Sequence, residues 1–103
     1  MSRLLLRPLF VFLTLAMLVV AFFSFAGTAL AAEWGVDRPG GDYKNFNLPS
    51  DQPSLCEQAC NGEAQCKAWT FVHPGIQGPS ARCWLKSSVP PKKNDSCCVS
   101  GVK

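Results

Sequence analysis

The sequence predicts a small α+β domain that is held together by disulfides. All six cysteines lie within residues 32–103, where they make up about 8% of the residues. One segment carries the start and stop signals of a short helix, and several others have the alternating, aromatic and β-branched pattern of strands. Because a chain of this size seldom forms a stable core without covalent cross-links, we expect one domain that is stabilised by disulfide bonds.

Residues 1–31 are typical of a secretory signal peptide. Two arginines give a positive start, an uncharged run follows over residues 9–26, and Ala29-Leu30-Ala31 supplies the small-x-small cleavage pattern. We therefore expect cleavage before Ala32 and a secreted or periplasmic location. The alternative is that residues 9–26 remain as a membrane anchor, since 18 apolar residues approach the length of a bilayer span.

The rest of the chain carries little net charge. Residues 32–103 hold eight Lys and Arg against seven Asp and Glu, so the +3 of the whole chain falls to +1. This near balance gives no reason to expect a nucleic-acid partner. Residues 32–41 include Pro39-Gly40-Gly41 and are interpreted as a flexible lead-in, so the domain proper is expected at residues 42–103.

The helix is predicted over about nine residues, after a short strand at residues 42–48. Ser50 or Asp51 could cap its first turn, where Pro53 is also favourable. Asn61-Gly62 is a stop signal in which the glycine can take the left-handed conformation.

Three later segments predict strands. Residues 66–72 (CKAWTFV) alternate and are rich in aromatic and β-branched residues. Residues 82–86 (RCWLK) are expected to return alongside them after a loop of Gly and Pro, and residues 97–103 (CCVSGVK) follow a proline-interrupted basic linker. One helix with three to five short antiparallel strands is an α+β arrangement.

The cysteine spacing C-x3-C-x5-C-x16-C-x13-CC allows about 15 complete pairings. Cys56 and Cys60 are four residues apart and share one helical face, so we expect each to reach the sheet rather than bond the other. A bond from Cys56 to Cys83 would close a loop of about 27 residues and stabilise the domain by roughly 3–4 kcal/mol in the chain-entropy model. Spacing alone does not choose among the remaining pairings.

No segment has the pattern of a metal site or a catalytic centre. The cysteines lack the repeated doublets of structural zinc sites, and the only histidine, His73, lies in the hairpin loop before a proline. With one histidine and seven scattered acidic residues, the sequence has neither the pattern of a catalytic triad nor a pair of carboxylates placed for acid–base catalysis. We therefore expect no metal, no cofactor and no enzymatic activity.

The order of the motifs resembles the PAN/Apple module, especially its short secreted bacterial form. The motifs are DRPGGDY, the C-x3-C helix, CKAWTFV, CWLK and CCVSGVK, and together they cover residues 37–103. The resemblance implies a twisted antiparallel sheet packed around one central helix, with the bridges Cys56–Cys83 and Cys60–Cys66. Larger Apple domains also bridge their two ends, but no cysteine lies between residue 32 and Cys56 to form that bond.

Cys97 and Cys98 are then left without an implied partner. Their Cα atoms are expected to lie about 3.8 Å apart across a trans peptide, below the usual disulfide range of about 4.4–6.8 Å. We nevertheless expect them to bond each other, because free thiols seldom persist in an oxidising compartment. Exchange with a helix cysteine, and a free or intermolecular pair, are the alternatives.

The remaining candidates for function lie on the hairpin and the linker. Basic residues there could form an edge, while the aromatic residues could either pack onto the helix or join a site for an anionic glycan or an acidic protein face. The candidate ligand-binding residues are Lys67, Trp69, Arg82, Trp84, Lys86, Lys92 and Lys93.

PAN/Apple modules look like adhesion or docking units, so the resemblance implies an exported, non-enzymatic module that binds protein or carbohydrate. Two alternatives belong to other classes. One is a structural envelope protein anchored by residues 9–26, for which a membrane would be a partner. The other is a redox-active or inhibitory miniprotein that uses the Cys97/Cys98 pair.

Overall fold

The computed structural model describes residues 31–103, which form five strands and one helix. In chain order the elements are β1 (Glu33–Asp37), β2 (Asp42–Asn47), α2 (Pro53–Asn61), β3 (Ala68–Val72), β4 (Arg82–Lys86) and β5 (Lys93–Val102). The predicted signal peptide and its alternative, an anchor at residues 9–26, lie outside the described residues. Between residues 31 and 103, no helix has the length and apolar character needed to cross a membrane.

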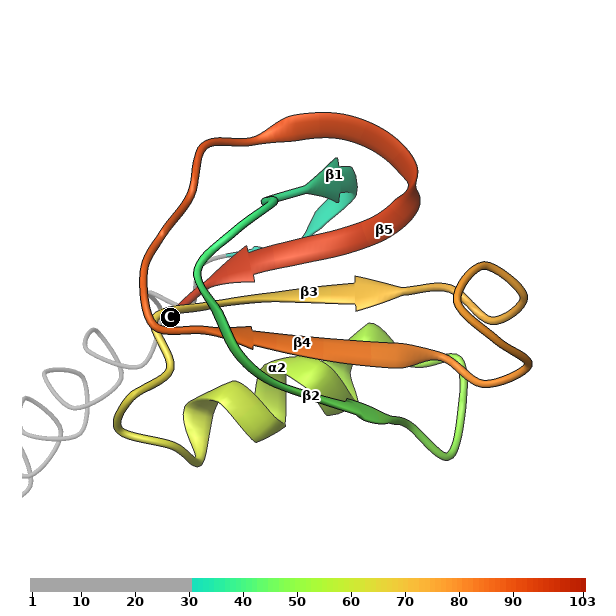
Figure 1. Cartoon of the computed structure of the whole chain (residues 1–103), viewed down its shortest axis with the longest axis horizontal. Helices are drawn as coiled ribbons and strands as arrows, with labels where there is room; N and C mark the ends of the chain where they lie inside the picture. The colour runs from blue at the N-terminus through green and yellow to red at the C-terminus, as the bar shows by residue number, and fades with distance from the viewer. Residues whose placement is uncertain (1–30) are drawn as a thin grey trace, which may run out of the picture.

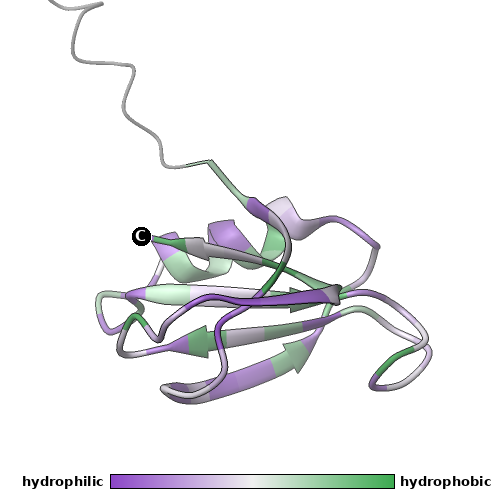
Figure 2. Ribbon diagram, turned by 90° about the horizontal axis from the view of Figure 1, so that it is seen from above, coloured by the Kyte–Doolittle hydropathy of each residue, from purple (hydrophilic) through white to green (hydrophobic). Residues whose placement is uncertain are grey.

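The strands form one antiparallel sheet in the order β1-β5-β3-β4-β2. The helix α2 lies against β3 and β4, and β5 is strongly curved, with β1 inside its curve (Figure 1). In the view turned by 90°, α2 lies on one side of the strands (Figure 2). The molecule therefore has two layers, and the predicted α+β fold with one helix on an antiparallel sheet is confirmed.

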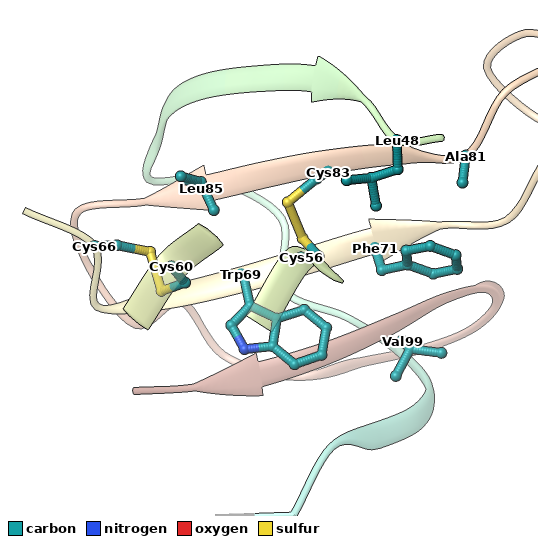
Figure 3. Close-up of a cluster of buried hydrophobic side chains, with 10 residues drawn as sticks. All are labelled: Leu48, Cys56, Cys60, Cys66, Trp69, Phe71, Ala81, Cys83, Leu85 and Val99. Carbon is teal, nitrogen blue, oxygen red and sulfur yellow. A yellow bond between two sulfur atoms is a disulfide. The ribbon is translucent and has the colours of Figure 1, made fainter. Parts of the chain in front are cut away.

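The core fills the space between α2 and the sheet. Because side chains alternate along a strand, Trp69 and Phe71 of β3 point to the same side as Cys83 and Leu85 of β4, toward the helix. Figure 3 shows these side chains around the two helix cysteines. The buried cluster consists of Leu48, Cys56, Cys60, Cys66, Trp69, Phe71, Ala81, Cys83, Leu85 and Val99.

Two disulfides fasten the helix within this core. Cys56 bonds Cys83 across 27 residues, with Cα atoms 5.3 Å apart, and Cys60 bonds Cys66 across six residues, with Cα atoms 5.2 Å apart. Both Cα distances lie in the usual range for unstrained bridges, and Figure 3 shows both bonds. The pairing implied by the resemblance is confirmed.

The helix has the predicted length, but its ends differ from the prediction. The residue before its first turn is Gln52 in an extended conformation, and no side chain caps the helix there. Ser50 and Asp51 come too early, because Pro53 fixes the first helical position. At the other end Gly62 has φ −79°, an ordinary right-handed conformation, so the stop does not depend on a left-handed glycine.

Strand β1 corrects the prediction that residues 32–41 form a flexible lead-in. Glu33–Asp37 pairs with β5, and the Ser100 hydroxyl on β5 donates a hydrogen bond to the Val36 carbonyl at 2.7 Å. The local sequence gives little sign of this strand, since it contains Gly35 at φ +69° and its partner lies more than 50 residues away. Strand β5 likewise begins at Lys93, before the predicted start at Cys97.

Candidate functional site

The sheet face away from α2 carries a concave pocket of about 430 Å³, which we call the sheet-face pocket. Its walls come from β1, the start of β2 with the turn before it, β3, β4, the hairpin loop and β5. The lining residues are Asp37, Pro39, Gly40, Asp42, Thr70, Val72, Ile76, Gln77, Trp84, Lys86, Asp95, Cys97 and Cys98. Since these segments are far apart in the sequence, only the folded sheet brings them together.

Trp84 provides the aromatic surface of the pocket. On β4 it lies between Cys83 and Leu85, whose side chains are in the core, so the alternation turns its indole to the opposite face. Its register partner on β3 is Thr70, another lining residue. The indole Nε1 donates a hydrogen bond to Gln77 Oε1 of the hairpin loop at 2.9 Å, which fixes the orientation of this half-buried ring.

The charged groups of the pocket are mostly acidic. Asp37, Asp42 and Asp95 line it together with one cation, Lys86. Three carboxylates against one ammonium leave a formal excess of two negative charges. The pocket therefore favours neutral or positively charged groups and disfavours anions.

Lys86 lies in the wall of this pocket as a buried, paired cation. Its side chain is 2% exposed, and its Nζ lies 2.6 Å from Asp42 Oδ1 and 3.1 Å from the Gly40 carbonyl oxygen. A buried ammonium needs such partners, because leaving it unpaired costs several kcal/mol. Lys86 thus joins β4 to the start of β2, and its predicted place in an exposed basic edge is wrong.

Cys97 and Cys98 reach the pocket through an irregularity in β5. Trp34 of β1 pairs with Val99, but Val36 pairs with Asn94, so residues 95–98 have no partner on β1 and bulge opposite Gly35, although Cys98 still pairs with Val72 of β3. Such a bulge redirects side chains, which explains how two adjacent cysteines both line one pocket. The structure joins them in a disulfide with Cα atoms 3.7 Å apart.

The other predicted ligand-binding residues do not come together. Trp69 is buried in the core, as the helix-packing alternative expects. The prediction that its indole contacts a ligand is therefore wrong. Arg82 donates hydrogen bonds to the side chains of Asn45 and Asn47, and Arg82 and Lys86 pair with opposite ends of β3.

The other three lysines lie at two places in the fold, Lys67 just before β3 and the adjacent Lys92 and Lys93 where β5 begins. Lys92 contacts the Glu33 carboxylate on β1, Lys67 is exposed just before β3, and Lys93 is exposed at the start of β5. The continuous basic edge that the sequence predicts does not form. Of the candidate residues, Trp84 and Lys86 line the sheet-face pocket.

Ion pairs hold the edge strands beside this site. Burial alone would raise the pKa of Glu33, but hydrogen bonds and charges from Arg38 and Lys92 outweigh it and keep the pKa below 4.5. On β2, burial and the neighbouring Glu63 carboxylate raise the pKa of Tyr43 above 10.0, while the hydrogen bond from Lys44 is the main cause that lowers the pKa of Glu63. These groups are structural, since they connect β1 and β2 to the rest of the domain.

The sequence pattern did not reveal the acidic lining of the pocket. Asp37, Asp42 and Asp95 look like ordinary turn or surface residues, because their juxtaposition depends on the pairing of β1 with β5 and of β2 with β4. One local signal was available: Trp84 and Lys86 alternate with Cys83 and Leu85. If Cys83 bonds the helix, the residues on either side of it must face away from the helix.

Comparison with known protein families finds a match over part of the chain. A family model described as PAN domain matches residues 36–86, which run from β1 through β4 and contain both helix disulfides. No curated protein is similar enough to the chain to count as a match. The match supports the resemblance to the PAN/Apple module, while the short bacterial form stays a prediction.

Proposed function

We propose that this chain, in which residues 36–86 match the PAN domain family, is an exported module that binds its ligand in the sheet-face pocket. PAN domains are generally non-catalytic modules that bind proteins or carbohydrates. Disulfides of this density are typical of proteins that leave the reducing cytosol. What we propose for this chain is that it is exported and that its ligand binds in the sheet-face pocket.

The observation that carries the proposal is the contrast between the two faces of the sheet. On the helix side, large side chains and two disulfides fill the space. On the other side, the pocket has an oriented indole and several polar groups at its surface. A concave site with an apolar platform and a few placed polar groups is the usual form of a ligand site.

The charge of the pocket supports a neutral or cationic ligand. A sugar ring could lie on the indole of Trp84 while its hydroxyl groups donate hydrogen bonds to Asp37 or Asp95. A cationic group, such as an amino sugar or a lysine or arginine side chain of a protein partner, would be attracted by both the carboxylates and the aromatic face. The anionic glycan expected from the sequence fits this pocket poorly, because two negative charges there are not neutralised.

A glycan array that contains neutral, amino and acidic sugars tests the class of ligand. We expect binding to neutral or amino sugars. Binding to the amino sugars should weaken as salt screens the carboxylates, and neutral sugars should be insensitive to salt. Binding confined to acidic glycans and abolished by salt would contradict the proposed class.

The intact mass of the exported protein tests its processing. We expect a chain that begins at Ala32. A chain that retains residues 1–31 and sediments with membranes would instead favour the anchored envelope protein.

A further inference from the structure

Asp37, Cys97 and Cys98 form a cluster of potential metal ligands in the sheet-face pocket. One carboxylate oxygen and the two sulfur atoms all lie within 4.8 Å of one another. We propose that the reduced form of this protein binds a thiophilic divalent cation, of the class of Zn²⁺ or Cd²⁺, through these three side chains. This inference does not depend on the proposed carbohydrate or protein ligand.

The fold favours reduction of this disulfide over the other two. Cys97 is only partly buried and lines the pocket, whereas Cys56, Cys60, Cys66 and Cys83 are fully buried. A dithiol reductant would attack the accessible sulfur, and thiol–disulfide exchange proceeds only where the thiolate can reach. In this step the Cys97–Cys98 bond takes up two electrons and two protons, and the dithiol becomes a disulfide.

The geometry of the cluster suits a tetrahedral cation. Zn–S bonds of about 2.3 Å and Zn–O bonds of about 2.0 Å place neighbouring ligand atoms about 3.5–3.8 Å apart. Once the disulfide is cleaved, the two sulfur atoms must move apart from bonding distance to about 3.8 Å, while Asp37 already lies within 4.8 Å of both. Adjacent cysteines would supply two ligands from one strand, and Asp37 would supply the third from its neighbour.

The chemistry of the ligands also fits such a cation. Thiolates select zinc, cadmium and other thiophilic ions over magnesium and calcium. Each thiol loses its proton on binding, so two thiolates and one carboxylate place three negative charges around a divalent cation. The fourth position would face the open pocket and could hold a water molecule.

Cadmium titration of the purified protein, before and after mild reduction with a dithiol that is then removed without oxygen, tests the proposal. We expect two reactive thiols for each chain after reduction. One equivalent of Cd²⁺ should then produce the ultraviolet charge-transfer band of cadmium thiolate, and Zn²⁺ should abolish the band by competition. The oxidised protein should show neither thiols nor the band.

Matched variants separate this site from general attraction of a cation by an acidic pocket. Asp37→Asn keeps an oxygen to accept the Arg38 backbone N–H at 2.7 Å and should weaken Cd²⁺ binding at least tenfold, because it removes a charged ligand. Asp95→Asn makes the same change of charge in the same pocket and should change the affinity about twofold or less. A Cys97→Ser/Cys98→Ser protein should lack the band.

Three results would overturn the inference. They are the release of six thiols at once under mild reduction, unchanged Cd²⁺ affinity in Asp37→Asn, and equal weakening by Asp37→Asn and Asp95→Asn. Should Asp37→Asn lose its fold, which circular dichroism would show, the stoichiometry of the wild type and of the double serine variant still decides the question.

Discussion

Gly101 on β5 leaves the space that the Trp69 ring needs. A Cβ at this position would lie 2.5 Å from atoms of the indole, closer than packed carbon atoms approach. Because Trp69 is held in the core on every side, it cannot move away without disturbing its neighbours. The glycine is therefore required by packing.

We predict that Gly101→Ala lowers the free energy of unfolding by about 1–3 kcal/mol, as expected for overpacking. Urea unfolding with the disulfides intact measures this loss. Gly62→Ala is the matched control, because the nearest atoms to its Cβ lie 3.6 Å away and its φ is −79°, and it should change stability by less than about 1 kcal/mol. Equal effects of the two substitutions would contradict the packing argument.

The two lysines Lys86 and Lys67 should differ in the same measurement. Lys86→Ala leaves Asp42 without its buried partner, so we predict a loss of about 2–3 kcal/mol, somewhat below the range for a fully buried pair because Asp42 is one-third exposed. Lys67→Ala removes an exposed side chain and should change stability by about 0.5 kcal/mol or less. If Lys86→Ala proves as mild as Lys67→Ala, the ion pair is not structural.

Sequence reasoning could not separate these lysines. Both lie beside strands of one hairpin, and their charges alone suggested one basic edge. Their difference arises where β2 begins: the Gly40 carbonyl before the strand and the carboxylate of its first residue, Asp42, accept hydrogen bonds from Lys86, 44 or more residues away. The orientation of Trp84, in contrast, could be inferred from the sequence, because Trp84 is next to Cys83 on a strand and the side chain of Cys83 faces the helix.

At the scale of elements, β1 depends on the ion pair between Glu33 and Arg38. Their side chains are only 16% and 9% exposed, with Nε and Oε1 2.9 Å apart, and Lys92 contacts the same carboxylate. Since the folded pKa of Glu33 lies below 4.5, ionised Glu33 stabilises the fold fully above pH 4.5. This contribution is lost as the pH falls through the folded pKa.

We predict that Glu33→Gln lowers stability by about 1 kcal/mol at pH 7. The difference between wild type and variant should shrink as the pH falls from 4.5 toward the folded pKa and below it. Thermal unfolding at several pH values would show this convergence. A difference that stays constant down to the lowest pH would mean that the charge of Glu33 has no part in holding β1.

The two helix disulfides should contribute unequally. In the chain-entropy model, closing 27 residues stabilises by about 3.5 kcal/mol and closing six by about 2 kcal/mol. We predict that Cys56→Ala/Cys83→Ala costs more than Cys60→Ala/Cys66→Ala in urea unfolding. Equal or reversed losses would show that packing around the sulfurs, rather than loop closure, sets their effect.

The elements with local signals were predicted, and the element without them was missed. The helix has its proline and apolar face, β3 and β4 have aromatic and β-branched residues, and all three were found. β1 contains a glycine and exposed residues, and its stability comes from pairing with β5, far along the chain, and from the ion pair with the neighbouring Arg38. The bulge at residues 95–98 was equally hidden, since register depends on the partner strand.

Across the whole molecule, the sheet has one face for stability and one for recognition. The face toward α2 contains the buried cluster and the two disulfides of the helix, while the other face presents the acidic, aromatic sheet-face pocket. The fold class and the helix disulfides followed from motif order and family resemblance. The pocket did not, because its acidic residues meet only through the order β1-β5-β3-β4-β2.

The most direct test of this division compares two tryptophans in their effect on ligand binding. Trp84 lines the pocket, whereas Trp34 is 67% exposed on β1 and is not part of the lining. With the best-bound sugar of the glycan array as probe, calorimetry should show binding weakened at least tenfold in Trp84→Ala and within about twofold of wild type in Trp34→Ala. Full affinity in a folded Trp84→Ala protein, or its loss in Trp34→Ala, would contradict a ligand site on this face of the sheet.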